Sequence, residues 1–202
     1  MGNVQRNLLD SDYLVFPNQF MEEKMSGAFN LKELYRGTIL REGYPRNSIF
    51  FDQEHGRLLK EVLGYQGCQL SVYMPTFRGR TDDVEGDTHV EQVRSYLEVI
   101  DKGMQDDQIL LLKLHPLVQK GLDLDNYRHI RPFPSELDTY DVLNACDVLI
   151  TDYSSVMYDF ANTGRKIILF AYDLEDYMGH RGMYEDIRSY PFPIAVTPEE
   201  VL

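Results

Sequence analysis

"CDVLITDYSSVMYDF", residues 146–160, joins an apolar run to a polar turn and then to a helical pattern. The run Val148–Thr151 is short and apolar, which indicates a buried strand. Small polar residues follow it, and a helix is expected over residues 154–163. A second apolar run, Lys166–Phe170, indicates another strand. A strand, a helix and a strand in this order predict a βαβ unit with parallel strands.

The same alternation extends along most of the chain. Further strands are expected at residues 12–17, 68–75, 109–114 and 127–130, with a short strand and a turn within 37–47. Helices are expected at residues 19–27, 52–63, 88–103 and 139–145, where apolar residues recur at helical spacing. Short apolar strands that alternate with helices predict an α/β fold. Its parallel sheet would be Rossmann-like, with helices on both faces.

The composition limits the kinds of partner. The chain has 202 residues, 43% of them hydrophobic, and a formal net charge of −13. Nucleic acid is an unfavourable partner for this charge, because phosphate-backbone affinity comes mainly from clustered Lys and Arg. No signal peptide and no apolar run of about 20 residues are visible. The two cysteines, Cys68 and Cys146, lie in apolar segments and indicate reduced thiols of a cytosolic protein.

Parallel sheets bind ligands at the carboxyl ends of their strands, and Ser154 and Ser155 lie at such a position. A helix N-terminus with two hydroxyls beside it could hold a phosphate or pyrophosphate. Alternatively, Ser154 or Asp152 only caps the helix. Asp159 follows Ser155 by one helical turn and could accept from ribose hydroxyls, or it could be a solvated helix carboxylate.

"LLLKLHP", residues 110–116, is an apolar run that ends in His115 and Pro116. His115 could act as a general base or stabilise a phosphate, and a purely structural role is the alternative. Lys113 is expected on the same face of the strand as His115. The remaining histidines show no metal-site spacing, which argues against a protein-built zinc centre: His55, His89, His129 and His180.

Two other polar segments follow predicted strands. "YMPTFRGR", residues 73–80, offers Thr76, backbone amides and two arginines after Pro75, or it is a surface loop. "GYPRN", residues 43–47, offers Arg46, or it is a simple turn. At the chain end, "TPEEVL" has the pattern of a capped helix start, with Thr197 as the cap. We therefore expect a truncated chain whose first dozen residues are also the tail of something larger.

Six motifs occur in one order: "GYPRN", "YMPTFR", "KLHP", "ITDYSSVMYDF", "FAYDLEDY" and "RGMYED". Together they resemble the C-terminal half of the CDP-glycerol glycerophosphotransferases, the primases and polymerases of wall teichoic acid synthesis. "DYLVFPN" resembles a segment near the end of that family's N-terminal half. The resemblance implies a GT-B architecture of two Rossmann-like domains. Residues 1–30 would be the tail of the N-terminal domain and the interdomain segment, and residues 31–202 the C-terminal donor-binding domain.

The resemblance also implies an activity. Glycerol phosphate would pass from CDP-glycerol to a lipid-linked, polyanionic acceptor, with release of CMP, at the cytoplasmic face of the membrane. No cofactor and no essential metal are expected, and the protein would be peripheral to the membrane. His115 matches a family histidine that lies at the donor phosphates, so the resemblance implies that His115 is catalytic. The matching positions also carry over the donor contacts Lys113, Leu114, Ser154, Ser155, Asp159, Arg46, Pro75 and Thr76.

One departure concerns a second histidine, which the family carries in an "HG" segment of its N-terminal half. "EHGR", residues 54–57, contains a His-Gly pair, but it follows "GYPR", whereas the family segment precedes "DYLV". The two are not equivalent, so the chain alone is expected to bind donor weakly and to turn over little. The alternatives are a GT-B sugar transferase or epimerase and an isolated, non-catalytic donor-binding module. Glycerol or ribitol, primase or polymerase, and homo-oligomer formation are left open.

Overall fold

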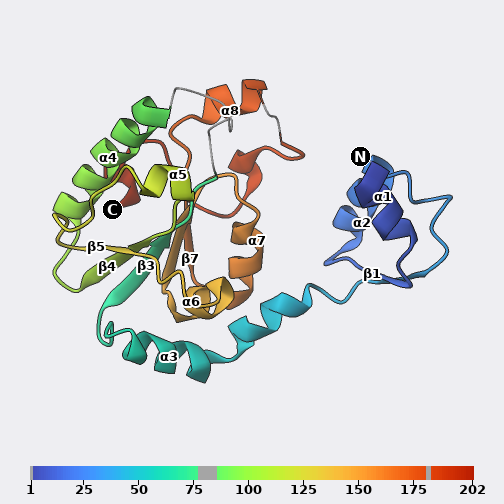
Figure 1. The fold of residues 1–202 in the computed structure, drawn as a ribbon, viewed down its shortest axis with the longest axis horizontal. Coiled ribbons are helices and arrows are strands. Elements are labelled where there is room, and N and C mark those ends of the chain that lie inside the picture. The colour runs from blue at the N-terminus through green and yellow to red at the C-terminus, as the bar shows by residue number, and fades with distance from the viewer. Residues whose placement is uncertain (1, 77–85, 181–182) are drawn as a thin grey trace. The chain divides into compact units, whose positions relative to one another are not determined.

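The computed structural model describes residues 2–76, 86–180 and 183–202, and the chain divides into two compact units (Figure 1). These units are Met1–Ser48 and Ile49–Leu202. The division falls later than the boundary expected after residue 30, because a parallel ladder ties residues 38–40 to residues 13–15. The assignment of the units to the two halves of a longer protein stays a prediction.

The first unit is small and has its own core. It contains α1 (Gly2–Leu9), β1 (Tyr13–Val15), α2 (Gln19–Ala28) and β2 (Thr38–Leu40). Asn18 caps α2 as its sequence position indicates, since its side-chain oxygen accepts from Met21 N at 2.9 Å. The buried hydrophobic side chains of this unit are Leu14, Phe16 and Leu31.

The second unit is built on a six-stranded sheet in the order β5-β4-β3-β6-β7-β8. The strands are β3 (Gln69–Tyr73), β4 (Gln108–Leu112), β5 (Ile130–Pro132), β6 (Val148–Thr151), β7 (Lys166–Phe170) and β8 (Ile194–Ala195). Every pairing is parallel. The chain first builds outward from β3 and then returns to build outward from β6, which is the doubly wound order. The α/β prediction is confirmed.

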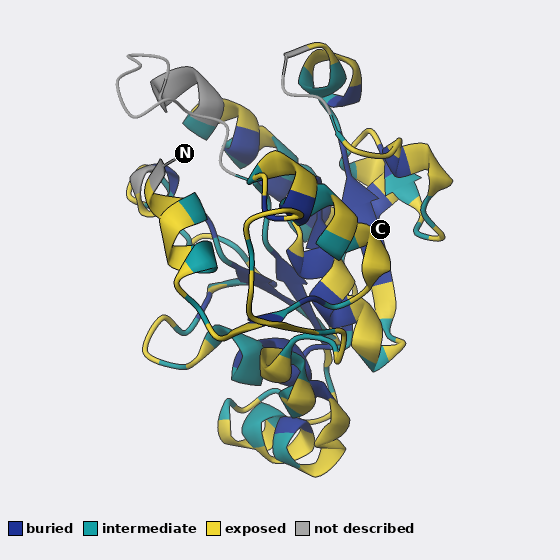
Figure 2. Ribbon diagram, turned by 90° about the vertical axis from the view of Figure 1, so that its right-hand side faces the viewer, coloured by how far each residue is buried: buried dark blue, intermediate teal, exposed yellow. Residues whose placement is uncertain are grey.

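Helices cover both faces of this sheet (Figure 1). They are α3 (Gln53–Val62), α4 (Gly86–Gly103), α5 (Pro116–Gln119), α6 (Thr139–Ala145), α7 (Val156–Phe160) and α8 (Leu174–His180). Four 3₁₀ helices lie among the described residues: η1 (Pro45–Phe51), η2 (Ala161–Thr163), η3 (Ile187–Ser189) and η4 (Glu199–Val201). The strands between the helices are mostly buried, as Figure 2 shows in dark blue.

The alternation along β4 divides the core into two clusters. Leu110 and Leu112 pack with α4, whereas Leu111 packs with α6 and α7 on the opposite face. All three side chains are exposed by 1% or less. A strand with both faces buried explains why its sequence is continuously apolar rather than alternating.

Some elements differ from their predicted positions or types. The strand expected over residues 127–130 runs over Ile130–Pro132 instead, and β8 was not expected. At the chain end the helix start is η4, a 3₁₀ helix without a side-chain cap. Half of the expected capping box forms, because the Glu200 carboxylate accepts from Thr197 N at 3.3 Å and from Val196 N at 2.7 Å.

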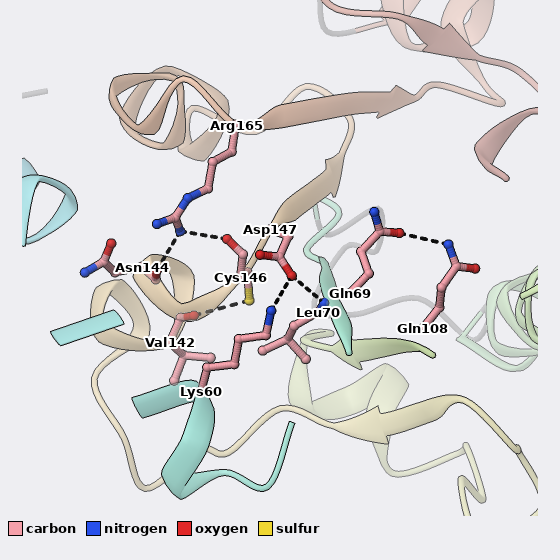
Figure 3. Close-up of polar contacts among 9 residues, drawn as sticks. All are labelled: Lys60, Gln69, Leu70, Gln108, Val142, Asn144, Cys146, Asp147 and Arg165. Carbon is pink, nitrogen blue, oxygen red and sulfur yellow. Dashed lines mark hydrogen bonds and ion pairs between the residues drawn. The ribbon is translucent and has the colours of Figure 1, made fainter. Parts of the chain in front are cut away.

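Charged side chains form hydrogen bonds and an ion pair at the amino ends of the central strands (Figure 3). Asp147 Oδ2 accepts from Leu70 N at 2.7 Å and lies 2.6 Å from Lys60 Nζ. Arg165 Nη1 donates to the carbonyl oxygens of Asn144 and Cys146, at the end of α6. A cation at a helix C-terminus satisfies free carbonyls and complements the helix dipole. These contacts position β6 without lying near the opposite, carboxyl ends of the strands.

Candidate functional site

The strand order reverses between β3 and β6, at the centre of the sheet. In doubly wound folds, ligands bind beyond the carboxyl ends of the strands at this switch point. The chain that follows β3 contains Pro75 and Thr76, and the chain that follows β6 contains Ser154 and Ser155. The fold therefore brings two separately predicted motifs to one edge of the sheet.

A pocket opens at this edge. Four of the predicted site residues line it: Pro75, Thr76, Leu114 and His115. The other lining residues are Tyr73, Val93, Val118 and Tyr172, which come from β3, α4, α5 and the end of β7. The structure thus joins "YMPT" and "KLHP" in one wall, although about forty residues separate them in the sequence.

His115 is exposed and lies where the chain changes from strand to helix. Its carbonyl oxygen accepts from Val118 N and Gln119 N, so it caps the short helix α5, which begins at Pro116. Pro116 suits this position, because the first helical residue needs no hydrogen-bonded amide. The strand was expected to extend to residue 114, but β4 ends at Leu112, and Pro116 begins α5 instead of ending the strand.

Lys113 takes a different direction from His115. Its ammonium group lies 4.1 Å from the centroid of the Phe133 ring, on the sheet face that carries α6. Burial lowers the pKa of Lys113, and the nearby Asp138 carboxylate partly opposes this shift. His115 instead shares the pocket with Leu114. The expected common face of Lys113 and His115 is therefore not found, because strand alternation does not continue past β4.

Asp152 connects the two halves of the site. It is fully buried, and its carboxylate accepts from Thr76 N at 2.9 Å and from Thr76 Oγ1 at 2.7 Å. It also accepts from Tyr153 N at 2.6 Å. The sequence suggested Asp152 only as a possible helix cap, whereas its described bonds come from Thr76, in the segment after β3, and from Tyr153 N.

Ser154 and Ser155 precede α7, whose first residue is Val156. Ser155 occupies the N-cap position but makes no side-chain cap hydrogen bond. Within the described residues, neither serine hydroxyl has a hydrogen bond, and Ser155 is exposed. The capping alternative is not supported for Ser155 or Asp152. Both serines directly precede the first residue of α7, and their contact with a phosphate stays a prediction.

Asp159 is 4% exposed, which excludes a solvated helix carboxylate. Tyr140 Oη, on α6, donates to Asp159 Oδ2 at 2.7 Å. A neutral phenol that donates to a carboxylate fixes its orientation without neutralising its charge. Tyr140 was not among the predicted residues, because nothing in the sequence indicates that α6 and α7 pack side by side.

Tyr153 was also missed. Its ring stacks on that of Tyr177 with 3.7 Å between centroids and 18° between planes. Its hydroxyl donates to Asp173 Oδ1 at 3.0 Å. These contacts join the turn after β6 to α8. The only sequence signal is the richness of "AYDLEDY" in tyrosines and acids.

The other predicted basic residues are Arg46 and the two arginines after Pro75. Arg46 lies in the first unit, where its guanidinium carbon is 4.2 Å from the centroid of the Tyr44 ring. Its donor contact stays a prediction. These two arginines, Arg78 and Arg80, lie outside the described residues.

The "EHGR" pair has a packing role. A Cβ on Gly56 would lie 2.4 Å from the Asn144 carbonyl oxygen, so this glycine permits the close contact of α3 with α6. His55 Nε2 lies 3.2 Å from Asp141 Oδ1, also on α6. Both neighbours belong to the helical layer, which agrees with the sequence argument that this pair is not the family's catalytic segment.

Two absences hold for residues 2–76, 86–180 and 183–202. No group of three or more His, Cys, Asp or Glu residues there is arranged to hold a metal ion. No helix in the same residues is both long and apolar enough to cross a membrane.

Known proteins resemble the chain along most of its length. The teichoic acid poly(glycerol phosphate) polymerase of Bacillus spizizenii is 32% identical over 95% of this chain and 49% of that protein. The teichoic acid poly(ribitol-phosphate) polymerase of the same organism is 30% identical over 81% of this chain and 27% of that protein. The chain therefore spans half or less of the length of these relatives.

A solved structure gives the same result for the fold. The wall teichoic acid polymerase TagF, in a histidine variant soaked with CDPG, superposes with a TM-score of 0.77 and 31% identity. The match covers 100% of this chain and 49% of that one, and it confirms the predicted fold class. The family model of the CDP-glycerol:poly(glycerophosphate) glycerophosphotransferases matches residues 2–202, so this chain belongs to that family.

Proposed function

We propose that this chain supplies the donor site of an enzyme that transfers glycerol phosphate from CDP-glycerol to a lipid-linked teichoic acid acceptor. The observation that carries the proposal is the pocket at the switch point. Pro75, Thr76, Leu114 and His115 line this pocket, and Asp152, two residues before Ser154, accepts a hydrogen bond from Thr76. Family membership and the likeness to a polymerase soaked with CDPG support the choice of donor.

In this proposal, the residues hold and polarise the donor diphosphate. The acceptor hydroxyl attacks the phosphorus that bears glycerol, and the bond from that phosphorus to the bridging oxygen breaks, so that CMP leaves. Ser154, Ser155 and the first amides of α7 hold the phosphate oxygens, and His115 stabilises the charge that develops on the leaving group. The acceptor proton passes to a base that we expect outside this chain.

Asp159 is proposed to hold the ribose. Buried carboxylates near a phosphate-binding helix accept from ribose hydroxyls in other nucleotide sites. The Tyr140 hydroxyl donates to Asp159 Oδ2, and in this proposal it orients the carboxylate that receives the ribose hydroxyls. Lys113, desolvated over Phe133, would add positive charge near the diphosphate.

The acceptor side of the reaction is also part of the proposal. A lipid-linked acceptor would require the enzyme to work at the cytoplasmic face of the membrane as a peripheral protein. The net charge of −13 is unfavourable for a polyanionic acceptor. We therefore propose that the basic acceptor surface lies in the remainder of the longer enzyme. Homo-oligomer formation stays a prediction.

The first test is binding. Isothermal titration of the chain with CDP-glycerol, CDP-ribitol and UDP-N-acetylglucosamine should give the tightest binding for CDP-glycerol. Comparable or tighter binding of the UDP-sugar would support a sugar transferase or epimerase instead. The same titration with CDP and CMP should show that the diphosphate contributes most of the affinity.

A donor-binding module without turnover is a second candidate, since the "EHGR" pair packs against α6 and does not match the family's second histidine. Mass-detected transfer to a prenol-linked acceptor separates the two candidates. Binding of CDP-glycerol without CMP release by this chain would support the module. CMP release that depends on acceptor would show that the chain carries a complete active site.

A further inference from the structure

Two aspartates bracket the central strand β6, and each ties it to the chain of β3 through a main-chain amide. Before the strand, Asp147 accepts from Leu70 N at 2.7 Å. After the strand, Asp152 accepts from Thr76 N, at 2.9 Å for each carboxylate oxygen. The two links are comparable and lie at opposite ends of the same strand pair. Only the second one reaches a residue of the pocket.

Asp152 binds both hydrogen-bond donors of Thr76. Besides the amide, Thr76 Oγ1 lies 2.7 Å from Asp152 Oδ1, and a carboxylate can only accept, so the hydroxyl is the donor. The preceding residue, Pro75, has no amide hydrogen. The Pro75–Thr76 segment can therefore offer a ligand its shape and its acceptor oxygens, while its N–H and O–H groups bind the buried carboxylate.

The connection between β3 and β6 does not require a carboxylate here. Met74 N already donates to Ile150 O at 2.9 Å, and Thr151 Oγ1 donates to Met74 O at 2.6 Å. Asp152 is nevertheless fully buried, and burial of a carboxylate is unfavourable unless several donors satisfy it. Its described donors belong to Thr76 and Tyr153, the residues that lead into the two halves of the site.

We infer that Asp152 is a positioning residue for the nucleotide donor. It acts through Thr76, by holding Pro75 and Thr76 in the pocket wall, and does not touch the donor itself. Thr76 then contributes an acceptor oxygen and a methyl group to the site, and does not donate to a phosphate. This inference rests on the proposed binding of CDP-glycerol at this pocket.

The experiment compares Asp152→Asn with Asp147→Asn in the 202-residue chain. Each substitution keeps the shape of the side chain but replaces one carboxylate oxygen, which accepts hydrogen bonds, by an NH2 group, which cannot accept them. In the unsubstituted chain, each of these carboxylates accepts from a main-chain N–H. Isothermal titration with CDP-glycerol should show affinity about 5- to 30-fold weaker for Asp152→Asn, the range for a buried hydrogen bond. Asp147→Asn should stay within about twofold of the unsubstituted chain.

Thr76 variants test whether Asp152 acts through this residue. Thr76→Val removes the hydroxyl donor, and it should weaken binding by a similar factor. Thr76→Ser keeps the donor and should recover affinity relative to Thr76→Val. The double variant Asp152→Asn/Thr76→Val should bind about as weakly as the weaker single variant, because residues that act as one unit are not additive.

The outcomes separate the inference from the function on which it rests. Equal affinities for Asp152→Asn and Asp147→Asn would overturn the inference and leave the proposed function intact. If the unsubstituted chain binds no CDP-glycerol, the proposed function and the inference both fail. If Asp152→Asn does not fold at the assay temperature, the Thr76 pair decides, since unchanged affinity in Thr76→Val overturns the inference.

Discussion

Gly56→Ala tests whether the His-Gly pair of "EHGR" has a packing role. The added Cβ would lie 2.4 Å from the Asn144 carbonyl oxygen and 3.0 Å from its carbonyl carbon. This carbonyl is the main-chain group that accepts from Arg165 Nη1, so it is held in place on its other side. Neither the oxygen nor the backbone of α6 can move away without loss of that bond.

Two opposed effects determine how much Gly56→Ala changes the free energy of unfolding. Overpacking of a rigid contact costs about 1–3 kcal/mol, and this contact is with backbone, which places Gly56→Ala near the upper end. Alanine improves helix propensity over glycine by about 1 kcal/mol. The expected net loss in the free energy of unfolding is about 2 kcal/mol. For a unit of this size, that corresponds to a fall in Tm of about 4–8 °C.

Gly103→Ala is the matched control. A Cβ at Gly103 would lie 2.1 Å from Leu202 Cδ1, which is even closer, but this atom ends a flexible side chain that is 53% exposed. The leucine can turn into solvent, so Gly103→Ala should leave Tm unchanged or slightly raised. Thermal unfolding followed by circular dichroism compares the two variants. Equal Tm values would refute the packing argument, and so would a CDP-glycerol affinity that falls in folded Gly56→Ala.

Three further results are expected. His115→Ala should lower turnover by about 100-fold or more in a turnover-competent full-length enzyme, and near-normal turnover would remove His115 from the mechanism. The pKa of Lys113 is lowered in the folded chain. At pH values between this lowered pKa and the ordinary lysine pKa of about 10.4, the unfolded chain therefore binds more protons than the folded chain. Stability should therefore rise with pH through this interval, and denaturant titrations should show a smaller rise in Lys113→Met; an identical pH dependence would contradict the assignment. Burial raises the pKa of the Cys146 thiol, whereas Cys68 is only half-buried. Iodoacetamide should modify Cys68 alone in the native chain, as peptide mass mapping would show, and native labelling of Cys146 would contradict its burial.

Local patterns predicted most of the sheet. Val148–Thr151 and Lys166–Phe170 were located at their observed bounds, because each is an apolar run between polar turns. β8 was missed because it has only two residues and no periodic pattern. The order of the strands could not be derived from the runs themselves, since pairing depends on contacts between residues far apart in the chain.

The site was partly predictable for the same reason. Polar residues after an apolar run indicate a strand end, and this placed Pro75, Thr76, Leu114 and His115 where the structure has a pocket. The direction of Lys113 was wrong, because alternation fails where the chain leaves the strand. The bond from Tyr140 to Asp159 was not predictable, because it depends on how α6 packs against α7.

The sequence by itself determined the fold class, the family and the motifs that end the strands, because these depend on short-range patterns and on residue identity. The tertiary structure alone decided which motifs meet. The reversal of strand order between β3 and β6 puts Thr76 within hydrogen-bonding distance of Asp152, although they lie 76 residues apart. The sequence indicated Asp152 only as a possible helix cap. Its complete burial and its bonds to Thr76, which support the inference that it orders the wall of the pocket, come only from the tertiary structure.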